Sequence, residues 1–354
     1  MKGVILAGGT GSRLRPITHA GPKQLIPVGN TPLIEYAIAD LRAAGITDIA
    51  VVLGNDGRTA LREHLGDGSD FGVDITYVVQ GPPRGVAHAI GCAEAFVDGE
   101  AFVVYLGDNI LAAGIEEQVE RFRTGAYAAG IAVQRVEDPG RFGVVVRDRD
   151  GRVERLVEKP DDPPTDLALV GIYRFTDVVF DVIDDLEPSA RGELEVTDAI
   201  QRIVDRGHDV DCTEVSGWWK DTGRPEDILD ANRQVLDGID RSVAGSVEAG
   251  ATVEGRVALA DGARVESGAV VRGPASIAEG AVVGAGATVG PYTSIGPDSD
   301  LRAVHVENSV LVGSATVTVD DHVVDSLLGR GVTLDGSGLE GRRLVVGADS
   351  TIDL

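Results

Sequence analysis

The N-terminal part of the chain alternates short apolar runs with longer amphipathic stretches. The stretches have helical length, and the first is predicted to begin at Pro32, with Thr31 as its N-cap, and to end at Gly45. The runs are rich in β-branched residues and are predicted to be buried strands: VILA at 4–7, IAVVLG at 49–54, ITYVVQ at 75–80 and FVVYLG at 102–107. Strands that alternate with helices predict an α/β domain with a largely parallel, doubly wound sheet.

After Asp240 the hydrophobic pattern changes to a period of six residues. The apolar positions form an unbroken series: Val247, Val253, Leu259, Val265, Val271, Ile277, Val283, Val289, Ile295 and Leu301. This pattern is similar to the hexapeptide repeat of left-handed parallel β-helices, in which three hexads form one coil. Beyond Leu301 we expect a short insertion, after which the repeat resumes at Val306 and Val312.

The change of period divides the chain into two predicted domains, an α/β domain at residues 1–240 and a β-helix at residues 241–354. In open parallel sheets, ligands bind beyond the carboxyl ends of the strands. The segment Gly8 to Arg15, Gln80 and Asp108 each follow a predicted strand directly. The sequence therefore predicts a ligand site at that edge of the sheet.

Composition and charge narrow the classes of function. The formal net charge of -25 at pH 7 makes the average surface repel nucleic acid and anionic membranes, so we expect neither as a partner. Because no apolar run has the length of a bilayer span or a signal-peptide core, a cytoplasmic protein is expected. The two cysteines, Cys92 and Cys212, are far apart and predict neither a disulfide framework nor a zinc site.

A glycine-rich loop follows the first predicted strand, with basic residues close behind it. Gly8, Gly9 and Gly11 bring bare backbone N–H groups close to a ligand, and such nests suit phosphate oxygens. Arg13 and Lys23 would add positive charge. The spacing matches neither a Walker P-loop nor the dinucleotide-binding fingerprint. On the glycines alone, a simple turn explains the loop as well as a phosphate site does.

Several motifs extend this pattern into a family resemblance. LAGGTGSRLRPITHAGPKQLIPVGNTPLIEYAI, at 6–38, closely resembles the signature of the sugar-1-phosphate nucleotidylyltransferases. Further motifs follow in the order of the glucose-1-phosphate thymidylyltransferase branch: VQGPPRGVAHA at 79–89, LGDN at 106–109, RFGVV at 141–145, VEKP at 157–160, RGELEVTD at 191–198 and WWKDTG at 218–223. The resemblance implies a Rossmann-like, GT-A-like catalytic domain, and the hexapeptide tail resembles that of the long form of these enzymes.

The resemblance implies transfer of a nucleotidyl group from dTTP to glucose-1-phosphate, with release of pyrophosphate. In the family a sugar-phosphate oxygen attacks the α-phosphorus directly, so the protein supplies positioning, neutralisation of charge and metal binding. The implied catalytic residues are Arg13, Lys23, Asp108 and Asp221, of which the two aspartates would bind Mg²⁺. The implied nucleotide contacts come from Leu6, Gly8, Gly9, Gly11, Arg13, Gln24, Gln80 and Gly85. The implied sugar-phosphate contacts come from Gly143, Glu158, Lys159, Val170 and Arg191.

Some of these residues and their neighbours can also be explained by a structural role alone. An aspartate after a strand also suits a turn, and Arg191 is explained nearly as well by an ion pair with Glu193 or Glu195. His88 is expected to support the site rather than to act in catalysis. Trp218 and Trp219 could simply belong to the core, but their place beside Asp221 favours packing that fixes its carboxylate.

Three alternative functions stay open at this point. The enzyme could use UTP or another hexose phosphate, since no residue in the sequence distinguishes between these substrates. It could be bifunctional, with an acyltransferase in the β-helix, for which His305 and His322 are the candidate residues. A regulatory subunit without turnover is disfavoured, because the basic and acidic residues of the implied site are all present. The β-helix is expected to serve self-association in a homo-oligomer.

Overall fold

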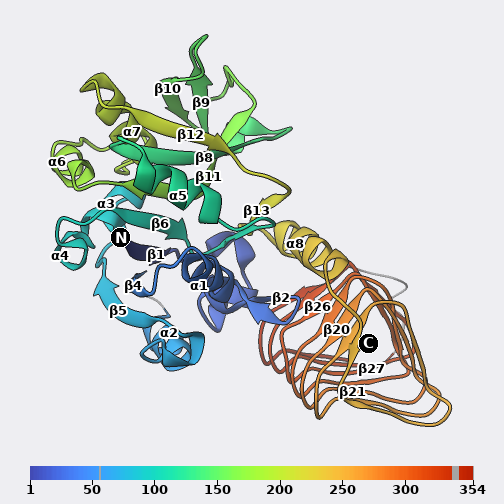
Figure 1. Ribbon diagram of the computed structural model, residues 1–354. Coiled ribbons are helices and arrows are strands. Elements are labelled where there is room, and N and C mark those ends of the chain that lie inside the picture. Colours follow the sequence, from blue (N-terminus) through green and yellow to red (C-terminus); the bar gives the residue numbers. More distant parts are fainter. Residues whose placement is uncertain (56, 337–342, 354) are drawn as a thin grey trace. The chain divides into compact units, whose positions relative to one another are not determined.

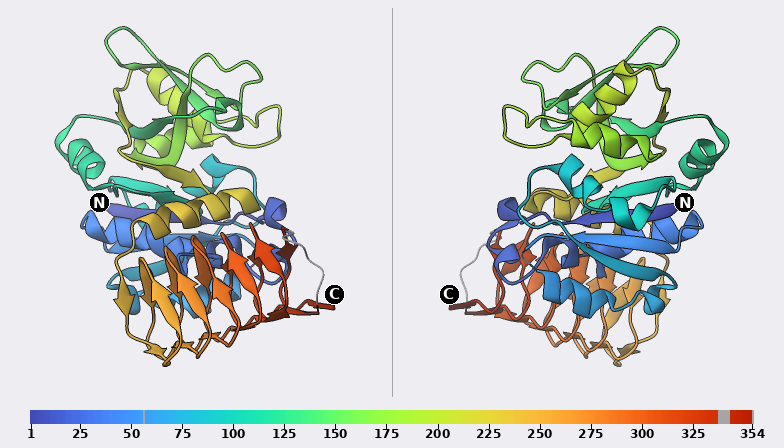
Figure 2. Two further views of the ribbon diagram at one scale, coloured as in Figure 1. Left: turned by 90° about the vertical axis from the view of Figure 1, so that its right-hand side faces the viewer. Right: turned by 90° about the vertical axis from the view of Figure 1, so that its left-hand side faces the viewer.

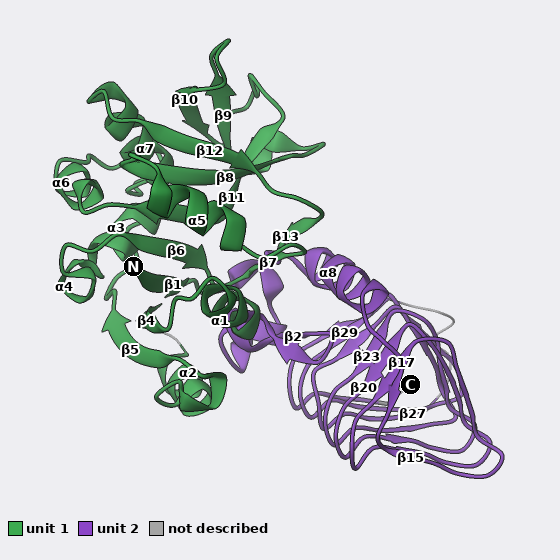
Figure 3. Cartoon of the chain, viewed as in Figure 1, with its two compact units in different colours: residues 1–10, 34–221 green, residues 11–33, 222–354 purple. Residues whose placement is uncertain are grey.

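The computed structural model describes residues 1–55, 57–336 and 343–353, which form two compact units (Figures 1 and 3). Unit 1 comprises residues 1–10 and 34–221, and unit 2 comprises residues 11–33 and 222–354. This division does not coincide with the predicted domains 1–240 and 241–354. The loop and hairpin at residues 11–33 and the helix α8 (Pro225–Asp237) group with the β-helix, because their contacts are with it.

Unit 1 is built on a nine-stranded mixed sheet. The order is β10-β9-β11-β6-β1-β4-β5, and β8 and β12 extend from β11. The four strands predicted from the sequence, β1, β4, β5 and β6, pair in parallel, which confirms the parallel core; β11 then runs antiparallel to β6. The strands are β1 (Lys2–Ala7), β4 (Asp48–Leu53), β5 (Asp74–Val79), β6 (Phe102–Leu106), β8 (Ala129–Arg135), β9 (Gly143–Arg147), β10 (Val153–Glu158), β11 (Leu167–Phe175) and β12 (Val210–Glu214).

Helices bury the apolar faces of this sheet. Three of them, α3, α6 and α7, contact one another and contribute to one hydrophobic cluster with residues of β1 and β6. None of the helices in the described residues is long and apolar enough to cross a membrane. The helices of unit 1 are α1 (Leu33–Ala43), α2 (Arg58–Leu65), α3 (Val86–Gly91), α4 (Glu94–Val97), α5 (Glu116–Thr124), α6 (Val178–Asp184) and α7 (Val196–Asp205).

A half-buried carboxylate on α1 is expected to make the stability of this unit depend on pH. Tyr105 Oη donates a hydrogen bond to Asp40 Oδ2 at 2.8 Å, yet burial raises the pKa of Asp40 from 3.8 to about 6. Between pH 3.8 and about pH 6, Asp40 therefore keeps its proton in the folded state and loses it in the unfolded state. The free energy of unfolding falls as the pH rises through this range.

Asp40→Asn is expected to keep an acceptor for Tyr105 and to remove the buried charge. The free energy of unfolding should exceed that of the parent by about 1–2 kcal/mol at pH 8, allowing for partial solvent exposure, and should match it near pH 4. Urea denaturation at the two pH values measures the difference. An equal gain at both pH values would show that the charge of Asp40 is not the cause.

The C-terminal part of unit 2 is a parallel β-helix of three stacked sheets, whose coils lie side by side in Figure 2. Sheet 1 contains β14 (Ser242–Val243), β17 (Val257–Leu259), β20 (Ala275–Ile277), β23 (Thr293–Ile295), β26 (Val310–Leu311), β29 (Leu327–Leu328) and β31 (Val345–Val346). Sheet 2 contains β15 (Ser246–Val247), β18 (Arg264–Val265), β21 (Val282–Val283), β24 (Asp300–Arg302), β27 (Thr316–Val319), β30 (Thr333–Gly336) and β32 (Thr351–Asp353). Sheet 3 contains β16 (Thr252–Glu254), β19 (Val270–Arg272), β22 (Thr288–Val289), β25 (His305–Glu307) and β28 (His322–Val324).

The strand register explains the six-residue period. Val265 pairs with Val283, 18 residues on, so three hexads make one coil, as predicted. Beyond Leu301 the predicted insertion is wrong, because the coil shortens there: Ile295 pairs with Leu311, only 16 residues on. Leu311 is fully buried in the core of the β-helix, whereas the predicted residue Val312 is only half-buried.

A short hairpin precedes α1 and also belongs to unit 2. It is formed by β2 (Pro27–Val28) and β3 (Thr31–Pro32), which pair antiparallel. The predicted start of the first helix is therefore wrong: strand pairing takes Thr31 and Pro32, and the helix begins at Leu33. Its predicted end at Gly45 agrees with the left-handed φ of 74° at that residue.

Candidate functional site

Three parallel strands of unit 1 end at one edge of the sheet, where glycines allow the chain segments to approach closely. Gly8 follows β1, Gly54 follows β4 and Gln80 follows β5. A Cβ added to Gly8 would lie 2.7 Å from Gln80 Oε1 and 3.2 Å from the backbone nitrogen of Gly54. A side chain at this position would fill the space beside the Gln80 amide. Leu6, near the end of β1, is buried, and Gly9 is exposed.

The amide of Gln80 is held in one orientation by its neighbours. Its Nε2 donates to the carbonyl oxygen of Gly85 at 3.3 Å and lies 3.1 Å from His88 Nδ1. Burial, together with Arg84 nearby, lowers the pKa of His88. A neutral imidazole can accept this hydrogen bond through Nδ1. His88 therefore lies behind Gln80 and supports it.

Gly85 is required by the backbone around it. Its φ is 111°, a region that L side chains rarely adopt, and a Cβ there would overlap the backbone of Leu194. Two backbone hydrogen bonds fix this approach, from Leu194 N to Arg84 O at 2.7 Å and from Ala87 N to Leu194 O at 3.0 Å. The VQGPPRGVAHA and RGELEVTD motifs, far apart in the sequence, therefore meet at Gly85.

The two predicted metal ligands lie at the same end of a small sheet. It consists of β7 (Asn109–Leu111) and β13 (Trp219–Asp221), and Asp221 is the register partner of Asn109. Asn109 Nδ2 donates to Asp108 Oδ1 at 3.0 Å, and Trp219 Nε1 donates to Asn109 Oδ1 at 2.6 Å. One buried amide thus connects the LGDN and WWKDTG motifs and fixes the carboxylate of Asp108.

The carboxylates at the end of this small sheet are suitable ligands for Mg²⁺. Asp108 and Asp221 offer hard carboxylate oxygens, which Mg²⁺ prefers. Among the described residues, no three or more His, Cys, Asp or Glu side chains gather in a way that could hold a metal ion. A cation here would take its remaining ligands from substrate phosphates and water, as Mg²⁺ commonly does. The residues therefore fit Mg²⁺ as two of its carboxylate ligands.

The predicted sugar-phosphate residues cluster around the carboxylate of Glu158. Lys159 Nζ and Arg191 Nη1 each lie 3.2 Å from Glu158 Oε1, and Thr197 Oγ1 donates to Oε2 at 3.2 Å. A Cβ on Gly143 would come within 3.1 Å of the same Oε2. The carboxylate thus holds two cationic side chains next to each other, and Gly143 lets Thr197, whose Cγ2 would lie 2.6 Å from that Cβ, pack close to the strand.

Arg191 and Val170, two of the predicted sugar-phosphate residues, also have contacts that a purely structural role would explain. Arg191 also forms ion pairs with Glu193 at 3.5 Å and Glu195 at 3.4 Å, so the structural explanation given for it above is present as well. Val170 is fully buried on β11 and pairs with Ala132 of β8.

Thr197, which belongs to this cluster, and the buried Tyr173 were not among the predicted site residues. Tyr173 lies on β11, and burial, with the carboxylates of Glu158 and Asp108 nearby, raises the pKa of its hydroxyl. The phenol therefore stays protonated and can donate a hydrogen bond. Thr197 is the seventh residue of RGELEVTD. Its motif is a sequence signal for it, whereas the proximity of Tyr173 to both carboxylates is visible only in the fold.

The remaining predicted residues lie in unit 2, on the loop after the first strand. Gly11 has a left-handed φ of 61°, and its carbonyl accepts a hydrogen bond from Thr18 Oγ1 at 2.8 Å. A Cβ on Gly11 would lie 3.2 Å from Lys23 Cβ. The stem of Lys23 therefore packs against the start of the loop, and Lys23 is half-buried, whereas Arg13 and Arg15 are exposed.

Arg13 lies over the last residue of the WWKDTG motif. A Cβ on Gly223 would come within 3.0 Å of Arg13 Nη2, so the missing side chain at this position leaves room for the guanidinium group. Gln24 follows Lys23 and is almost fully buried, and its Oε1 has no hydrogen-bond partner among the described residues. Buried acceptors are nearly always satisfied in folded proteins, so this oxygen can accept a hydrogen bond from a water molecule or a ligand.

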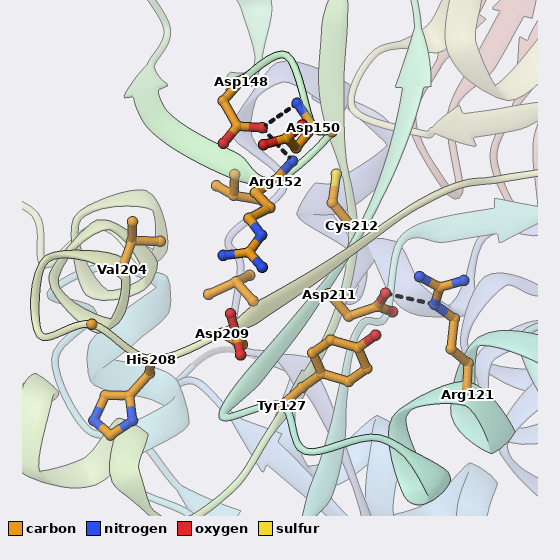
Figure 4. A pocket seen from close by; sticks show the side chains of 14 residues that line it. Arg121, Tyr127, Asp148, Asp150, Arg152, Val204, His208, Asp209, Asp211 and Cys212 are labelled. Atoms are coloured by element: carbon orange, nitrogen blue, oxygen red, sulfur yellow. Dashed lines mark hydrogen bonds and ion pairs between the residues drawn. The ribbon is translucent and has the colours of Figure 1, made fainter.

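A pocket of about 540 Å³ opens elsewhere on unit 1 (Figure 4). Arg152, His208 and Asp209 line it, together with Asp211, which pairs with Arg121 Nε at 2.7 Å. None of the predicted site residues lines this pocket. Its mixed charges do not favour one class of ligand, and the candidate site is therefore placed at the strand ends and the motifs described above.

Comparison with known proteins identifies relatives over the whole chain. The sequence pattern of the nucleotidyl transferase family matches residues 2–238. The chain is 58% identical to the low-salt glycan biosynthesis nucleotidyltransferase Agl11 of Haloferax volcanii over 357 aligned positions, which cover 100% of both proteins. It is 41% identical to a glucose-1-phosphate thymidylyltransferase of Streptomyces antibioticus, over 100% of this chain and 99% of that protein. A crystal structure of a putative glucose-1-phosphate thymidylyltransferase from Bacillus anthracis, in complex with sucrose, superposes with a TM-score of 0.64 at 42% identity, covering 68% of this chain and 97% of that one.

Proposed function

The chain belongs to the nucleotidyl transferase family, and from this premise we propose that it transfers a thymidylyl group from dTTP to glucose-1-phosphate in the presence of Mg²⁺, giving dTDP-glucose and pyrophosphate. The full-length match to a relative named as a glucose-1-phosphate thymidylyltransferase supports this choice of substrates. The observation that carries the proposal is the small sheet in which Asp221 lies opposite Asn109. Asp108 directly precedes Asn109, so this pairing supports the proposal that the two aspartates, remote in sequence, are ligands of one metal ion.

The proposed reaction is an in-line displacement at the α-phosphorus of dTTP. An oxygen of the sugar phosphate forms the new bond to the α-phosphorus, and the bond from that phosphorus to the pyrophosphate oxygen breaks. Mg²⁺ held by Asp108 and Asp221 would supply neutralisation of charge on the phosphate oxygens. Arg13 and Lys23 would bind the triphosphate, and Lys23 would stabilise the charge that grows on the departing pyrophosphate.

The nucleotide base would be recognised at the edge that carries Gln80 and Gly85. The Nε2 of Gln80 is occupied by Gly85 and His88, which leaves its Oε1 to accept a hydrogen bond from a pyrimidine N–H. Gly85 would let the base approach the backbone. The unpartnered Oε1 of Gln24 is a second acceptor, suited to a hydroxyl or N–H group of the nucleotide.

The glucose-1-phosphate would be bound around Glu158. Its carboxylate would accept hydrogen bonds from sugar hydroxyls, and the backbone of Gly143 next to it would contact the sugar. Lys159 and Arg191, both held at 3.2 Å from Glu158 Oε1, would bind the sugar phosphate together. Tyr173, whose hydroxyl stays protonated, would donate to a ligand oxygen between Glu158 and Asp108.

The acyltransferase alternative gains no support from the geometry of its two histidines. His305 and His322 pair in register on β25 and β28, and their ring centroids are 4.6 Å apart. His305 Nε2 also lies 3.5 Å from Glu307. The two rings contact each other at an interplanar angle of 33° on one outer face of the β-helix, and ring packing alone explains this arrangement.

The test is a comparison of kcat/KM for dTTP and UTP, each with glucose-1-phosphate and with an amino-sugar phosphate. We expect dTTP with glucose-1-phosphate to be preferred by roughly tenfold or more over each other pair. A higher kcat/KM with UTP would replace the proposed nucleotide. Thiol release from acetyl-CoA in the presence of the amino-sugar phosphate would show that the β-helix has a second activity.

A further inference from the structure

The hairpin that follows Lys23 is fastened to the β-helix through its turn. The turn residues are Gly29, with a φ of 58°, and Asn30, with a φ of 67°; positive values at both positions are typical of a type I′ turn. Asn30 Nδ2 donates to Ser276 Oγ at 2.9 Å and to the carbonyl oxygen of Ile295 at 3.1 Å. Ser276 and Ile295 lie on β20 and β23, so one side chain spans two neighbouring coils.

A buried amide on α8 holds the same turn from the other side. Asn232 is fully buried, and its Oδ1 accepts hydrogen bonds from Gly29 N at 2.9 Å and from Ser294 Oγ at 2.7 Å. Its Nδ2 donates to the carbonyl oxygen of Tyr292 at 3.0 Å. A buried amide is costly without such partners. The Asn232 side chain therefore links α8, the hairpin and sheet 1, all of which lie in unit 2 (Figure 3).

The outer face of sheet 1 is built to be covered at this place. Its outward-pointing residues pair in register from coil to coil, and Ser276, Ser294, Val310 and Leu327 are all buried. At the register-paired positions of sheet 2, Arg264 and Thr316 are exposed and Asp300 is half-buried, whereas Val282 is buried. Outward residues of a solenoid normally face solvent, so the burial of Ser276 and Ser294, which bond to Asn30 and Asn232, fits a cover formed by the hairpin and α8.

A second contact holds the beginning of the same segment. Gly347, directly after β31, lies against Pro16: a Cβ at Gly347 would come within 3.2 Å of both Pro16 Cβ and its carbonyl oxygen. Lys23 lies between this contact and the turn at Gly29 and Asn30. Backbone hydrogen bonds connect it to the hairpin, from Ile26 N to Lys23 O at 3.0 Å and from Leu33 N to Ile26 O at 3.1 Å.

We propose that Asn30 and Asn232 are positioning residues for nucleotidyl transfer, which hold the hairpin on the β-helix and through it set the position of Lys23. The β-helix would thereby take part in the reaction as the scaffold of a catalytic lysine. The inference rests on the proposed function of Lys23. A displacement of about 1 Å at a catalytic group can lower a rate on the order of a hundredfold, so a loose hairpin should be visible in the chemical step.

The test uses the full chain with substitutions on both sides of this contact. Asn30→Gly keeps the positive φ of the turn and removes both hydrogen bonds, and Ser276→Ala removes one acceptor from the β-helix. Ser276→Thr retains the hydroxyl. The matched control is Ser309→Ala, because Ser309 is a buried β-helix serine whose hydrogen bonds, to Glu307 O and from Ser326 N, stay within the β-helix.

Two measurements are made on each variant: the single-turnover rate with saturating dTTP and glucose-1-phosphate, and hydrogen exchange of the peptide that contains Lys23. For Asn30→Gly we expect a rate about tenfold lower, little change in dTTP affinity, and exchange faster by on the order of tenfold. Ser276→Ala should change in the same direction by about threefold. Ser276→Thr should recover most of the rate, and Ser309→Ala should keep the parent rate and exchange.

The outcomes separate this inference from the proposed function. Parent-like rates and exchange in both Asn30→Gly and Ser276→Ala would overturn the positioning role, and so would an equal loss in Ser309→Ala. If the parent protein transfers no nucleotide, the proposed function fails, and hydrogen exchange alone then decides whether these residues hold the Lys23 segment. If Asn30→Gly does not fold, Ser276→Ala and Ser276→Thr still decide.

Discussion

Replacing Lys23 with alanine is expected to lower the single-turnover rate of nucleotide-sugar formation by roughly a hundred- to a thousandfold. Binding of dTTP should weaken much less. The reason is that the negative charge near the α-phosphate and the departing pyrophosphate is greatest in the transition state, so the ammonium group contributes more there than in the bound ground state. Rapid-quench kinetics at saturating substrates, combined with calorimetric titration of dTTP, measures the two effects separately.

Two further variants make this prediction specific to the position of the charge. Lys23→Arg should recover only part of the rate, because a planar guanidinium group cannot replace a compact ammonium group. Lys2→Ala removes another lysine, whose Nζ donates to the carbonyl oxygen of Phe96 at 2.7 Å within unit 1, and should leave the rate near that of the parent. If Lys23→Ala reacts within a few-fold of the parent, Lys23 is not a catalytic group.

Asp108→Asn and Asp221→Asn are each expected to reduce turnover by about a thousandfold at limiting Mg²⁺. Each change keeps the size of the side chain and removes one negative charge from the proposed metal site. Folding should survive, because the pairing of Asp221 with Asn109 is made by the backbone. The measurement is steady-state turnover as a function of Mg²⁺ concentration, with circular dichroism as the check of the fold.

The matched control for the two aspartates is Asp98→Asn. Asp98 is exposed after α4 and has a φ of 52°, a conformation that asparagine also adopts readily. This variant should titrate with Mg²⁺ as the parent does. Near-normal turnover of both Asp108→Asn and Asp221→Asn at limiting Mg²⁺ would mean that the two carboxylates do not bind the metal.

Much of the fold follows from the period of apolar residues along the chain. Buried parallel strands and the inward positions of a β-helix both leave a local repeat of apolar residues. The structure confirms the strand predicted around Val4 and the inward position predicted for Val283, and both residues are buried. Local rules fail where distant pairing overrides them. Thr31 and Pro32 satisfy the rules for a helix start, yet their pairing with β2 places them in a strand.

The grouping of the hairpin with the β-helix was not predictable from the sequence. Asn30 and Ser276 are 246 residues apart, and their contact is a single hydrogen bond between polar side chains. Such contacts leave no periodic signal, because one asparagine in a turn satisfies the turn's own rules. The predicted boundary near residue 240 follows the change of period, whereas the compact units follow these contacts.

Motifs indicated the candidate site residues, and the fold adds the groups that hold them. Gln80 and Asp108 follow strands, which is a local signal for the ligand-binding edge of a sheet. The supporting roles of Asn109, which binds both Asp108 and Trp219, and of Thr197, which binds Glu158, depend on hydrogen bonds between distant segments. A motif predicts which residues matter more readily than how they are oriented.

The central claim, that the sugar phosphate attacks the α-phosphorus of dTTP, is tested most directly by following the reaction by ³¹P NMR. The protein is mixed with dTTP, glucose-1-phosphate and Mg²⁺, and a matched sample contains excess EDTA. We predict that dTDP-glucose and inorganic pyrophosphate appear in equal amounts, and that neither forms in the sample with EDTA. The account would be contradicted if orthophosphate were released without formation of a sugar nucleotide. It would also be contradicted if dTTP were not consumed with any sugar phosphate.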